Sequence, residues 1–329
     1  MPRILLVKLS SLGDVIHNFP VVTDIRLHRP DMTIDWITEA PYTELVRLHP
    51  GIDRVYPLSL RDVARQWWSP TCWRKLIQQK RQLQETLYDY ALDTQGLLKS
   101  AAVTNWISAP GAGFGPQSAR EPLAARFYAQ RYEVPRDQHA VMRNRALAAA
   151  ALNYRADNPL DYGLTLPAQT LPWAPDRAYV VFLHASSREN KKWPLASWIA
   201  LGRYLSEYNI AVVLPWGNLQ EQNDSRHIAA VLDNAIVPPA MSLGDAALML
   251  GSAQVVIGVD TGLAHLAVAL HRPTVGLYMT TSPARTGLYA GDQDDTGWRI
   301  VNLGGGTTTA PTIPSVDAVW GHVRDWITP

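Results

Sequence analysis

Residues 8–17, with the sequence KLSSLGDVIH, place a carboxylate a few residues after two hydroxyls. The carboxylate of Asp14 could take a proton from a substrate hydroxyl, as a general base does. Gly13 relieves the steric limits where a strand turns into a helix, and the hydroxyls of Ser10 and Ser11 can cap that helix. The same spacing suits a carboxylate that only complements the helix dipole. From these residues alone, both interpretations of Asp14 remain open.

A second segment, residues 184–194 with the sequence HASSRENKKWP, combines hydroxyls with ammonium groups. A bound diphosphate needs hydrogen-bond donors and positive charge, which Ser186, Ser187 and Lys191 could supply. The segment is not a Walker loop, because it lacks a Gly-Lys-Ser or Gly-Lys-Thr triplet. The alternative is a solvated loop whose serines cap the next helix.

A third segment, residues 258–265, has the sequence GVDTGLAH at another strand-to-helix junction. Asp260 ends the expected strand, Thr261 can cap the helix, and Gly262 permits a ligand to approach closely. His265 follows Thr261 by four residues and lies on the same helix face. The alternative is a helix cap beside a core histidine. No further ligands follow at a recognisable spacing, so the sequence predicts no metal site.

Two segments carry an excess of positive charge, although the formal net charge of the chain is only +1. Residues 61–81 contain six Lys or Arg and one acidic residue, with Trp67, Trp68 and Trp73 interleaved. Residues 120–145 contain six Arg and three acidic residues. The excess favours an anionic acceptor or a membrane surface over an ordinary solvated face. Interleaved aromatics also suit single-stranded nucleic acid, but no nucleic-acid module pattern accompanies them.

Short apolar runs that alternate with helical patterns must position these segments. Strands are expected at residues 4–9, 34–38, 55–58, 90–93, 179–184, 210–214, 255–259 and 274–278. Helices are expected at residues 139–152, 195–208, 262–270 and 316–327. The alternation indicates an α/β chain of βαβ units with parallel sheets covered on both faces. Ligands of such sheets bind where the strand order reverses, which places the site in a cleft between two halves.

Length and composition are consistent with two domains. The chain has 329 residues, of which 47% are hydrophobic, and a Pro-containing stretch at residues 159–175 separates domains of residues 1–165 and 176–315. The single cysteine, Cys72, precludes an internal disulfide and fits a reducing compartment. The first apolar run is too short for a signal peptide, and no run approaches the roughly 18 apolar residues of a membrane span. We therefore expect a cytoplasmic protein that is at most peripheral to a membrane.

The three segments together resemble the heptosyltransferases of lipopolysaccharide core synthesis, most closely the type I enzymes. The resemblance covers nearly the whole chain, including residues 7–17, 35–39, 93–100, 119–124, 138–141, 184–194, 214–217 and 259–266. It implies the GT-B fold, in which two Rossmann-like domains face each other across a cleft and the C-terminal helix packs back on the N-terminal domain. It also implies heptose transfer with inversion from ADP-heptose to the Kdo sugar of Kdo-lipid A, without a cofactor, at the inner membrane.

The resemblance also implies roles for individual residues. Asp14 would be the general base, and Lys191 would stabilise the leaving ADP. The donor would be held by Ser186, Ser187, Lys191, Glu221, Met241, Asp260, Thr261, Gly262 and His265. Relatives often carry two threonines at the Ser-Ser pair, so both hydroxyls are kept. The acceptor would be held by Ser10, Gly13, Arg61, Arg65, Arg120 and Arg143.

Three other functions were weighed. A type II heptosyltransferase would add heptose to a heptosylated core, but the SSLGD and DTGLAH runs favour type I. A nicotinamide-dependent oxidoreductase would need Gly-x-Gly-x-x-Gly after the first strand, which residues 10–14 do not provide. A non-catalytic nucleotide-sugar-binding protein would tolerate the loss of Asp14.

Overall fold

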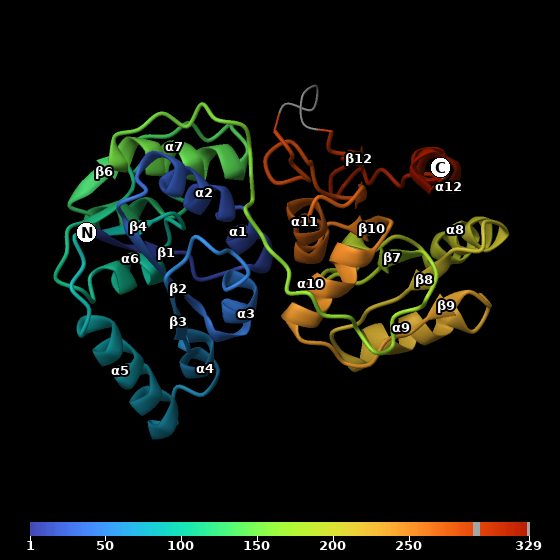
Figure 1. The fold of residues 1–329 in the computed structure, drawn as a ribbon, viewed down its shortest axis with the longest axis horizontal. Helices are drawn as coiled ribbons and strands as arrows, with labels where there is room; N and C mark the ends of the chain where they lie inside the picture. The colour runs from blue at the N-terminus through green and yellow to red at the C-terminus, as the bar shows by residue number, and fades with distance from the viewer. Residues whose placement is uncertain (292–296, 328–329) are drawn as a thin grey trace. The chain divides into compact units, whose positions relative to one another are not determined.

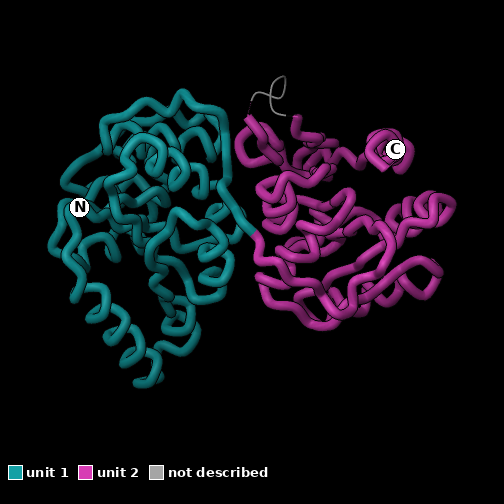
Figure 2. Tube along the Cα trace, in the orientation of Figure 1, with its two compact units in different colours: residues 1–165 teal, residues 166–329 magenta. Residues whose placement is uncertain are grey.

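The structure is a computed structural model that describes residues 1–291 and 297–327. The chain divides into two compact units, unit 1 (Met1–Thr165) and unit 2 (Leu166–Pro329) (Figure 2). The division falls inside the Pro-containing stretch that separates the two halves in the sequence. Within the described residues, no helix is both long and apolar enough to cross a membrane.

Unit 1 is built on a six-stranded parallel sheet in the order β3-β2-β1-β4-β5-β6. The strands are β1 (Arg3–Val7), β2 (Thr33–Glu39), β3 (Arg54–Leu58), β4 (Tyr90–Asp93), β5 (Gly111–Phe114) and β6 (Gln130–Tyr132). The α-helices are α1 (Leu12–Ile16), α2 (Phe19–His28), α3 (Thr43–Val46), α4 (Leu60–Arg65), α5 (Pro70–Gln84), α6 (Leu98–Thr104) and α7 (Ala140–Leu152). Short 3-10 turns lie at Ala40–Tyr42 and Pro122–Phe127. The strand order reverses between β1 and β4, which is the switch point of such sheets.

Helices cover both faces of this sheet, as the continuous apolar strands require. Leu5 and Val7 of β1 belong to the apolar cluster that includes buried residues of α4, α5 and α6. On the other face, α2 and α7 pack against each other (Figure 1). A buried ion pair joins these two helices, because Arg145 Nε lies 2.7 Å from Asp24 Oδ2. This pairing fixes α7 beside the carboxyl end of β1.

Unit 2 repeats the same sheet, in the order β12-β11-β10-β7-β8-β9, with all strand pairs parallel. The strands are β7 (Tyr179–Leu183), β8 (Ala211–Val213), β9 (Ala235–Ile236), β10 (Val255–Val259), β11 (Thr274–Tyr278) and β12 (Ile300–Gly304). The helices are η3 (Glu189–Lys191), α8 (Leu195–Glu207), α9 (Leu219–Ala229), α10 (Leu243–Ser252), α11 (Gly262–Ala269) and α12 (Val316–Ile327). Numbered from the start of each unit, both sheets have the Rossmann order 3-2-1-4-5-6. The switch point of unit 2 lies between β7 and β10.

The C-terminal helix α12 packs on unit 2 through its apolar face. Its apolar residues Val319, Val323 and Ile327 are buried in the core of unit 2. They pack on α8, β10 and β11, and Trp320 stacks on Tyr204 of α8 with ring centroids 5.2 Å apart. The apolar face of α12 thus covers its own unit, whose sheet and α8 present an apolar surface. The expected packing on the first half stays a prediction.

The expected strands and helices are present within one or two residues of their predicted ends, whereas four strands were missed. These are β5, β6, β9 and β12, of which β6 and β9 have only three and two residues. Strands this short carry no periodic signal. Strand β5 has the sequence GAGF, whose glycines and alanine are weak strand formers.

Candidate active site

The loop after β1 brings Asp14 to the switch point of unit 1. Ser11 precedes α1 and donates from its backbone N and its Oγ to Asp14 Oδ2, at 3.0 and 3.1 Å. Asp14 therefore completes a capping box in the first turn of α1, where its negative charge can also complement the helix dipole. Its side chain nevertheless remains 24% exposed, so a substrate hydroxyl can reach it.

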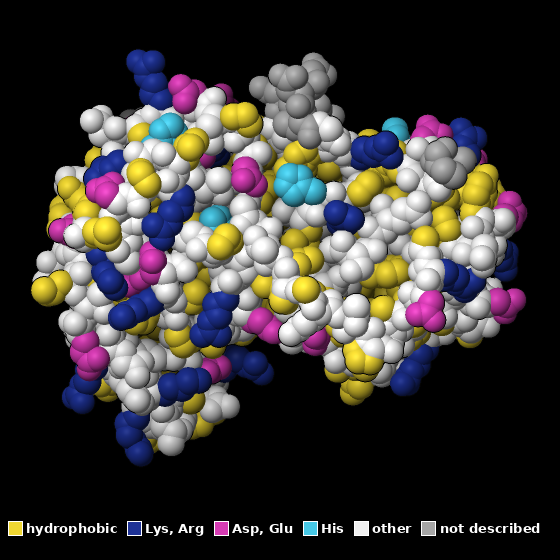
Figure 3. Space-filling view, in the orientation of Figure 1, with side chains coloured by type: hydrophobic (Ala, Val, Ile, Leu, Met, Phe, Trp, Pro, Cys, Tyr) yellow, Lys and Arg dark blue, Asp and Glu magenta, His cyan; other side chains and the backbone are white. Residues whose placement is uncertain are grey.

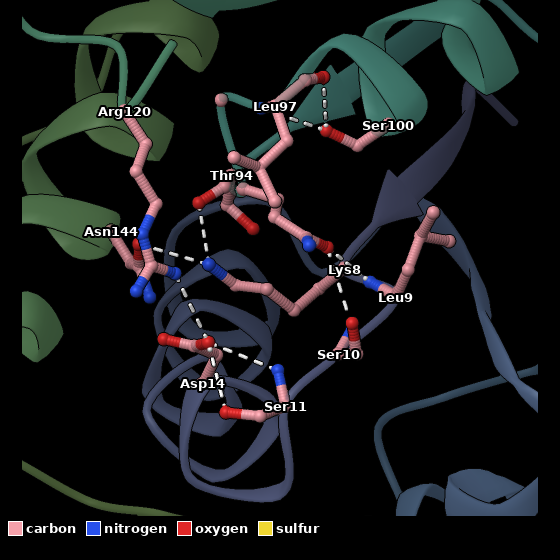
Figure 4. Close-up of polar contacts among 12 residues, drawn as sticks. Lys8, Leu9, Ser10, Ser11, Asp14, Thr94, Leu97, Ser100, Arg120 and Asn144 are labelled. Atoms are coloured by element: carbon pink, nitrogen blue, oxygen red, sulfur yellow. Dashed lines mark hydrogen bonds and ion pairs between the residues drawn. The ribbon is translucent and has the colours of Figure 1, made fainter. Parts of the chain in front are cut away.

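Lys8 lies beneath this carboxylate and fastens the loops around it. Its side chain is buried, and Nζ donates to the carbonyl of Thr94 at 2.5 Å and to Asn144 Oδ1 at 3.5 Å (Figure 4). Thr94 follows β4 and Asn144 lies on α7, so one ammonium group joins three elements. The backbone N of Leu9 adds a bond of 2.7 Å to Gln95 Oε1. The loops after β1 and β4 are thus held together at the switch point.

Charges around Asp14 set its ionisation. Burial raises the pKa of the Asp14 carboxyl, but the charge of Lys8, the hydrogen bonds of Ser11 and the charge of Arg120 outweigh it and leave that pKa below the usual value. Burial lowers the pKa of Lys8 to about 8, against the opposing effects of Asp14 and Asp93. At neutral pH the pair is therefore mostly a carboxylate beside an ammonium group.

Arg120 approaches Asp14 from a loop that other arginines hold in place. Arg120 NH1 lies 3.3 Å from Asp14 Oδ2, and its side chain is 63% exposed. Arg143 donates to the carbonyls of Ser118 and Pro135, at 2.6 and 3.0 Å, so it braces the segment before Arg120. Arg143 thus contacts the backbone on both sides of Arg120, and its guanidinium also lies over the ring of Phe114, 4.9 Å from the centroid.

The other expected acceptor residues divide into two groups. Ser10 lies in the loop after β1, and Gly13 and Asp14 lie in the first turn of α1. Ser10 Oγ accepts a hydrogen bond of 2.9 Å from Lys99 Nζ. Arg61 and Arg65 lie on α4, after β3. The guanidinium of Arg61 lies over the ring of Tyr42, 5.4 Å from its centroid. The structure thus joins Ser10, Gly13 and Asp14 at one strand-to-helix junction and places Arg61 and Arg65 on a separate helix.

A pocket of about 220 Å³ lies at the switch point of unit 2. Residues from four loops or helix starts line it, including Ser186, Ser187, Glu221, Met241 and Thr261. Its wall mixes the apolar side chains of Trp216 and Leu243 with these hydroxyls, as nucleotide sites commonly do. Five of the nine expected donor residues therefore surround one cavity.

Two further donor residues form an ion pair beside this pocket. Lys191 Nζ lies 2.5 Å from Asp260 Oδ2, and the two side chains are 19% and 18% exposed. Thr281 Oγ1 also donates to Asp260 Oδ2, at 2.9 Å. The neighbouring Lys192 points elsewhere, because its ammonium group pairs with Glu189 and Asp224. The structure thus places the two adjacent lysines in different surroundings.

The remaining donor residues belong to α11. Gly262 begins this helix directly after Thr261, and His265 is 7% exposed within it. No set of three or more His, Cys, Asp and Glu side chains in the part of the chain that the structure describes is placed to hold a metal ion.

Sequence reasoning missed three residues at the unit 1 site: Lys8, Lys99 and Asn144. Lys8 and Lys99 lie in motifs that the sequence singled out, but neither was given a role. Asn144 lies 136 positions from Lys8 along the chain. Only a buried lysine at the end of an apolar strand hinted at this cluster, because such an ammonium group needs partners.

Comparison with known proteins identifies relatives of the whole chain. The model of glycosyltransferase family 9 (heptosyltransferase) matches residues 75–300. A lipopolysaccharide heptosyltransferase 1 from Pseudomonas aeruginosa is 42% identical over 318 residues, covering 94% of this chain and 86% of that protein. The enzyme of the same name from Escherichia coli K12 is 36% identical over 293 residues, covering 88% of this chain and 92% of that protein.

The solved structures agree with these relatives. The structure of E. coli heptosyltransferase WaaC with ADP superposes with a TM-score of 0.88 at 33% identity, covering 98% of this chain and 99% of that one. E. coli ADP-heptose heptosyltransferase II superposes with a TM-score of 0.77 at 19% identity, covering 99% of this chain and 98% of that one, which supports the shared fold. The predicted GT-B fold class is confirmed. The two Rossmann-like units, the family match and the similarity over most of the length together establish that this chain belongs to glycosyltransferase family 9, the heptosyltransferases.

Proposed function

We propose that this protein transfers heptose from ADP-heptose to the Kdo sugar of Kdo-lipid A, with inversion at the anomeric carbon. The observation that carries the proposal is the pairing of two switch-point sites in one chain. Unit 1 offers an ionised, accessible carboxylate, Asp14, and unit 2 offers a pocket lined with hydroxyls beside Lys191. The relatives are named lipopolysaccharide heptosyltransferase 1, and this name supports a heptosyl donor and a lipopolysaccharide acceptor.

ADP-heptose fits the site of unit 2. Ser186 and Ser187 line the pocket as hydrogen-bond donors for the diphosphate, and Lys191 can exchange Asp260 for a phosphate oxygen. Glu221 and Met241 line the same cavity, at a place suited to the adenosine. Support comes also from the solved structures of E. coli heptosyltransferase WaaC with ADP and with ADP-2-deoxy-2-fluoro heptose.

The chemistry follows from the residues of both sites. The attacking hydroxyl of the acceptor loses its proton to Asp14 as its oxygen bonds to the anomeric carbon. The bond from that carbon to the diphosphate breaks, and Lys191 stabilises the negative charge that the leaving ADP gains. One displacement inverts the anomeric carbon, so no enzyme nucleophile is needed.

The acceptor is anionic, because Kdo carries a carboxylate and lipid A carries phosphates. Arg120 stands beside Asp14 with most of its side chain exposed, so it can bind the Kdo carboxylate next to the base. Arg61 and Arg65 supply further positive charge from α4. On this proposal the enzyme uses no cofactor and works as a peripheral protein on the cytoplasmic face of the inner membrane.

An assay of ADP release tests the proposal. The protein is mixed with ADP-heptose and either delipidated Kdo-lipid A or the same core already carrying one heptose. We expect turnover with the first acceptor and little with the second. Turnover only with the heptosylated core would assign a type II activity instead. Binding of ADP-heptose without turnover on either acceptor would indicate a nucleotide-sugar-binding protein.

A further inference from the structure

Helices α4 and α5 form a hairpin, residues 60–84, whose tip exposes an unusual number of large apolar side chains. Trp67, Trp68 and Trp73 are 69%, 67% and 46% exposed, and Ile77 is 48% exposed. The 12 tryptophans of the chain include Trp36, Trp193 and Trp198, which are almost completely buried. An exposed indole does not gain the free energy that burial of its apolar surface would provide. Several exposed indoles at one tip therefore require an explanation.

The hairpin is anchored to unit 1, so its tip is a fixed feature of the surface. Val63, Leu76 and Leu83 are buried in the cluster that covers one face of the sheet. At the tip, Trp73 Nε1 donates to the carbonyl of Trp67 at 2.7 Å. The rings of Trp67 and Trp68 meet edge to face, with centroids 6.1 Å apart. The tryptophans are therefore held in place on a rigid support.

Positive charge surrounds these tryptophans. The exposed cations of the hairpin are Arg61, Arg65, Arg74, Lys75 and Arg81. The acidic residue among them, Asp62, pairs with Lys75 at 3.4 Å. Lys and Arg side chains gather over α4 and α5 in the space-filling view (Figure 3). Cations around apolar rings are complementary to a surface whose outer layer is anionic and whose interior is apolar.

We propose that the α4–α5 hairpin docks unit 1 on an anionic lipid bilayer, with the tryptophans at the level of the headgroups. Indoles favour this level because the ring is apolar and its N–H remains hydrated. Lysine and arginine near an anionic leaflet add electrostatic attraction. The inference rests on the proposed function, in which the acceptor is itself a lipid of the membrane.

Two other occupants fit the hairpin less well. A second copy of this chain would bring the same cations against each other, and like charges repel. Single-stranded nucleic acid stacks its bases on parallel aromatic faces, whereas the rings of Trp67 and Trp68 stand at 83° to each other. Docking on a bilayer requires neither contact between like charges nor parallel aromatic faces.

Vesicle binding of the full chain tests the inference. The protein is sedimented with vesicles of phosphatidylcholine alone or mixed with phosphatidylglycerol, at low and high salt. We expect binding to the anionic vesicles, weakened by salt. We expect Trp67→Ser combined with Trp68→Ser to weaken it on the order of tenfold. Arg74→Gln combined with Arg81→Gln should weaken it roughly 30-fold at low salt, given the usual attraction per cation.

Matched controls separate docking from general effects. Arg155→Gln combined with Arg203→Gln removes the same charge from exposed sites outside the hairpin, and Leu219→Ser removes a side chain that is 75% exposed on α9. Both should bind vesicles like the wild type. Equal binding of hairpin and control variants would overturn the inference. So would a loss of dimerisation or of single-stranded DNA binding in the hairpin variants while vesicle binding stays intact.

Activity on a delipidated acceptor distinguishes this inference from the proposed function. The tryptophan variant and the Arg74, Arg81 variant should turn over the delipidated acceptor at the wild-type rate, because none of the four residues is assigned to either site. On acceptor embedded in vesicles they should be slower. Vesicle binding by a protein that lacks heptosyltransferase activity would retain the docking surface and reject the proposed function. Equal rates on embedded acceptor would reject the docking surface alone.

Discussion

The two units use the same sheet but place their lysines differently. Lys8 ends β1 and is 5% exposed, with its ammonium group on a backbone carbonyl of the neighbouring loop. Lys191 lies in the loop after β7, is 19% exposed and pairs with Asp260. Lys8 cannot leave its site without losing its partners, whereas Lys191 can exchange one anion for another. The buried lysine therefore acts on the ionisation of Asp14, and the accessible lysine acts on a ligand.

This difference indicates a division of labour. A general base needs a constant electrostatic environment, which a fully surrounded charge supplies. A diphosphate site must accept and release its ligand, which an accessible ion pair permits at little cost. Substitutions in each unit should therefore alter different measurable quantities.

The largest effect should come from Asp14→Asn. This change keeps the shape of the side chain and removes its capacity to take a proton, so kcat should fall about 10²–10⁴-fold. Steady-state kinetics measure the loss, and titration with ADP should show unchanged donor binding. Turnover near the wild-type rate would remove Asp14 from the mechanism and leave it as a helix cap.

Lys191→Ala should affect the donor side alone. Losing one charge-assisted contact to the diphosphate should lower kcat/KM for ADP-heptose about 10- to 100-fold. Lys192→Ala is the matched control, because its ammonium group pairs with Glu189 and Asp224. If both variants lost activity equally, the distinction between the two lysines would be wrong.

Lys8→Met should shift the pH profile. Lys8 stabilises the ionised form of Asp14, so removing the positive charge raises the pKa of that carboxyl. The acid limb of kcat/KM should then move to higher pH. The pH profiles of kcat/KM for the variant and the wild type, measured in a series of buffers between pH 3 and 8, test this shift. An unmoved acid limb would mean that Lys8 only holds the loops together.

Arg120→Ala should have a smaller effect, confined to the acceptor. Its exposed guanidinium can bind the Kdo carboxylate, and its loss should raise the acceptor KM roughly fivefold. The KM for ADP-heptose should stay near that of the wild type. Arg126→Ala, an exposed arginine of the same basic segment, provides the control. Equal acceptor KM values in both variants would exclude Arg120 from the acceptor site.

A metal chelator should have the smallest effect. We find no candidate ligand set among the described residues, so activity should persist in excess EDTA. Complete inactivation that added metal reverses would show that an ion takes part in the reaction.

The amino-acid sequence alone determined the local parts of this protein. Strand β10 lies at the predicted residues 255–259, because a run of four β-branched residues and one glycine, bounded by polar residues, favours a buried strand. The three strand-to-helix junctions were also recognisable, since Gly13, Thr261 and Gly262 have local backbone reasons to be there. Family resemblance then supplied roles that these residue types could not decide.

Only the tertiary structure decided which distant groups meet. The carbonyl of Thr94 and the amide of Asn144 lie 86 and 136 positions from Lys8, so no local pattern relates them. The partner of Lys191 and the packing of α12 on unit 2 were likewise undetermined, because an apolar helix face identifies no particular sheet. The spacing of apolar and polar residues indicates which side chains are buried and therefore need hydrogen-bond partners. Which partners they meet depends on how the whole chain folds.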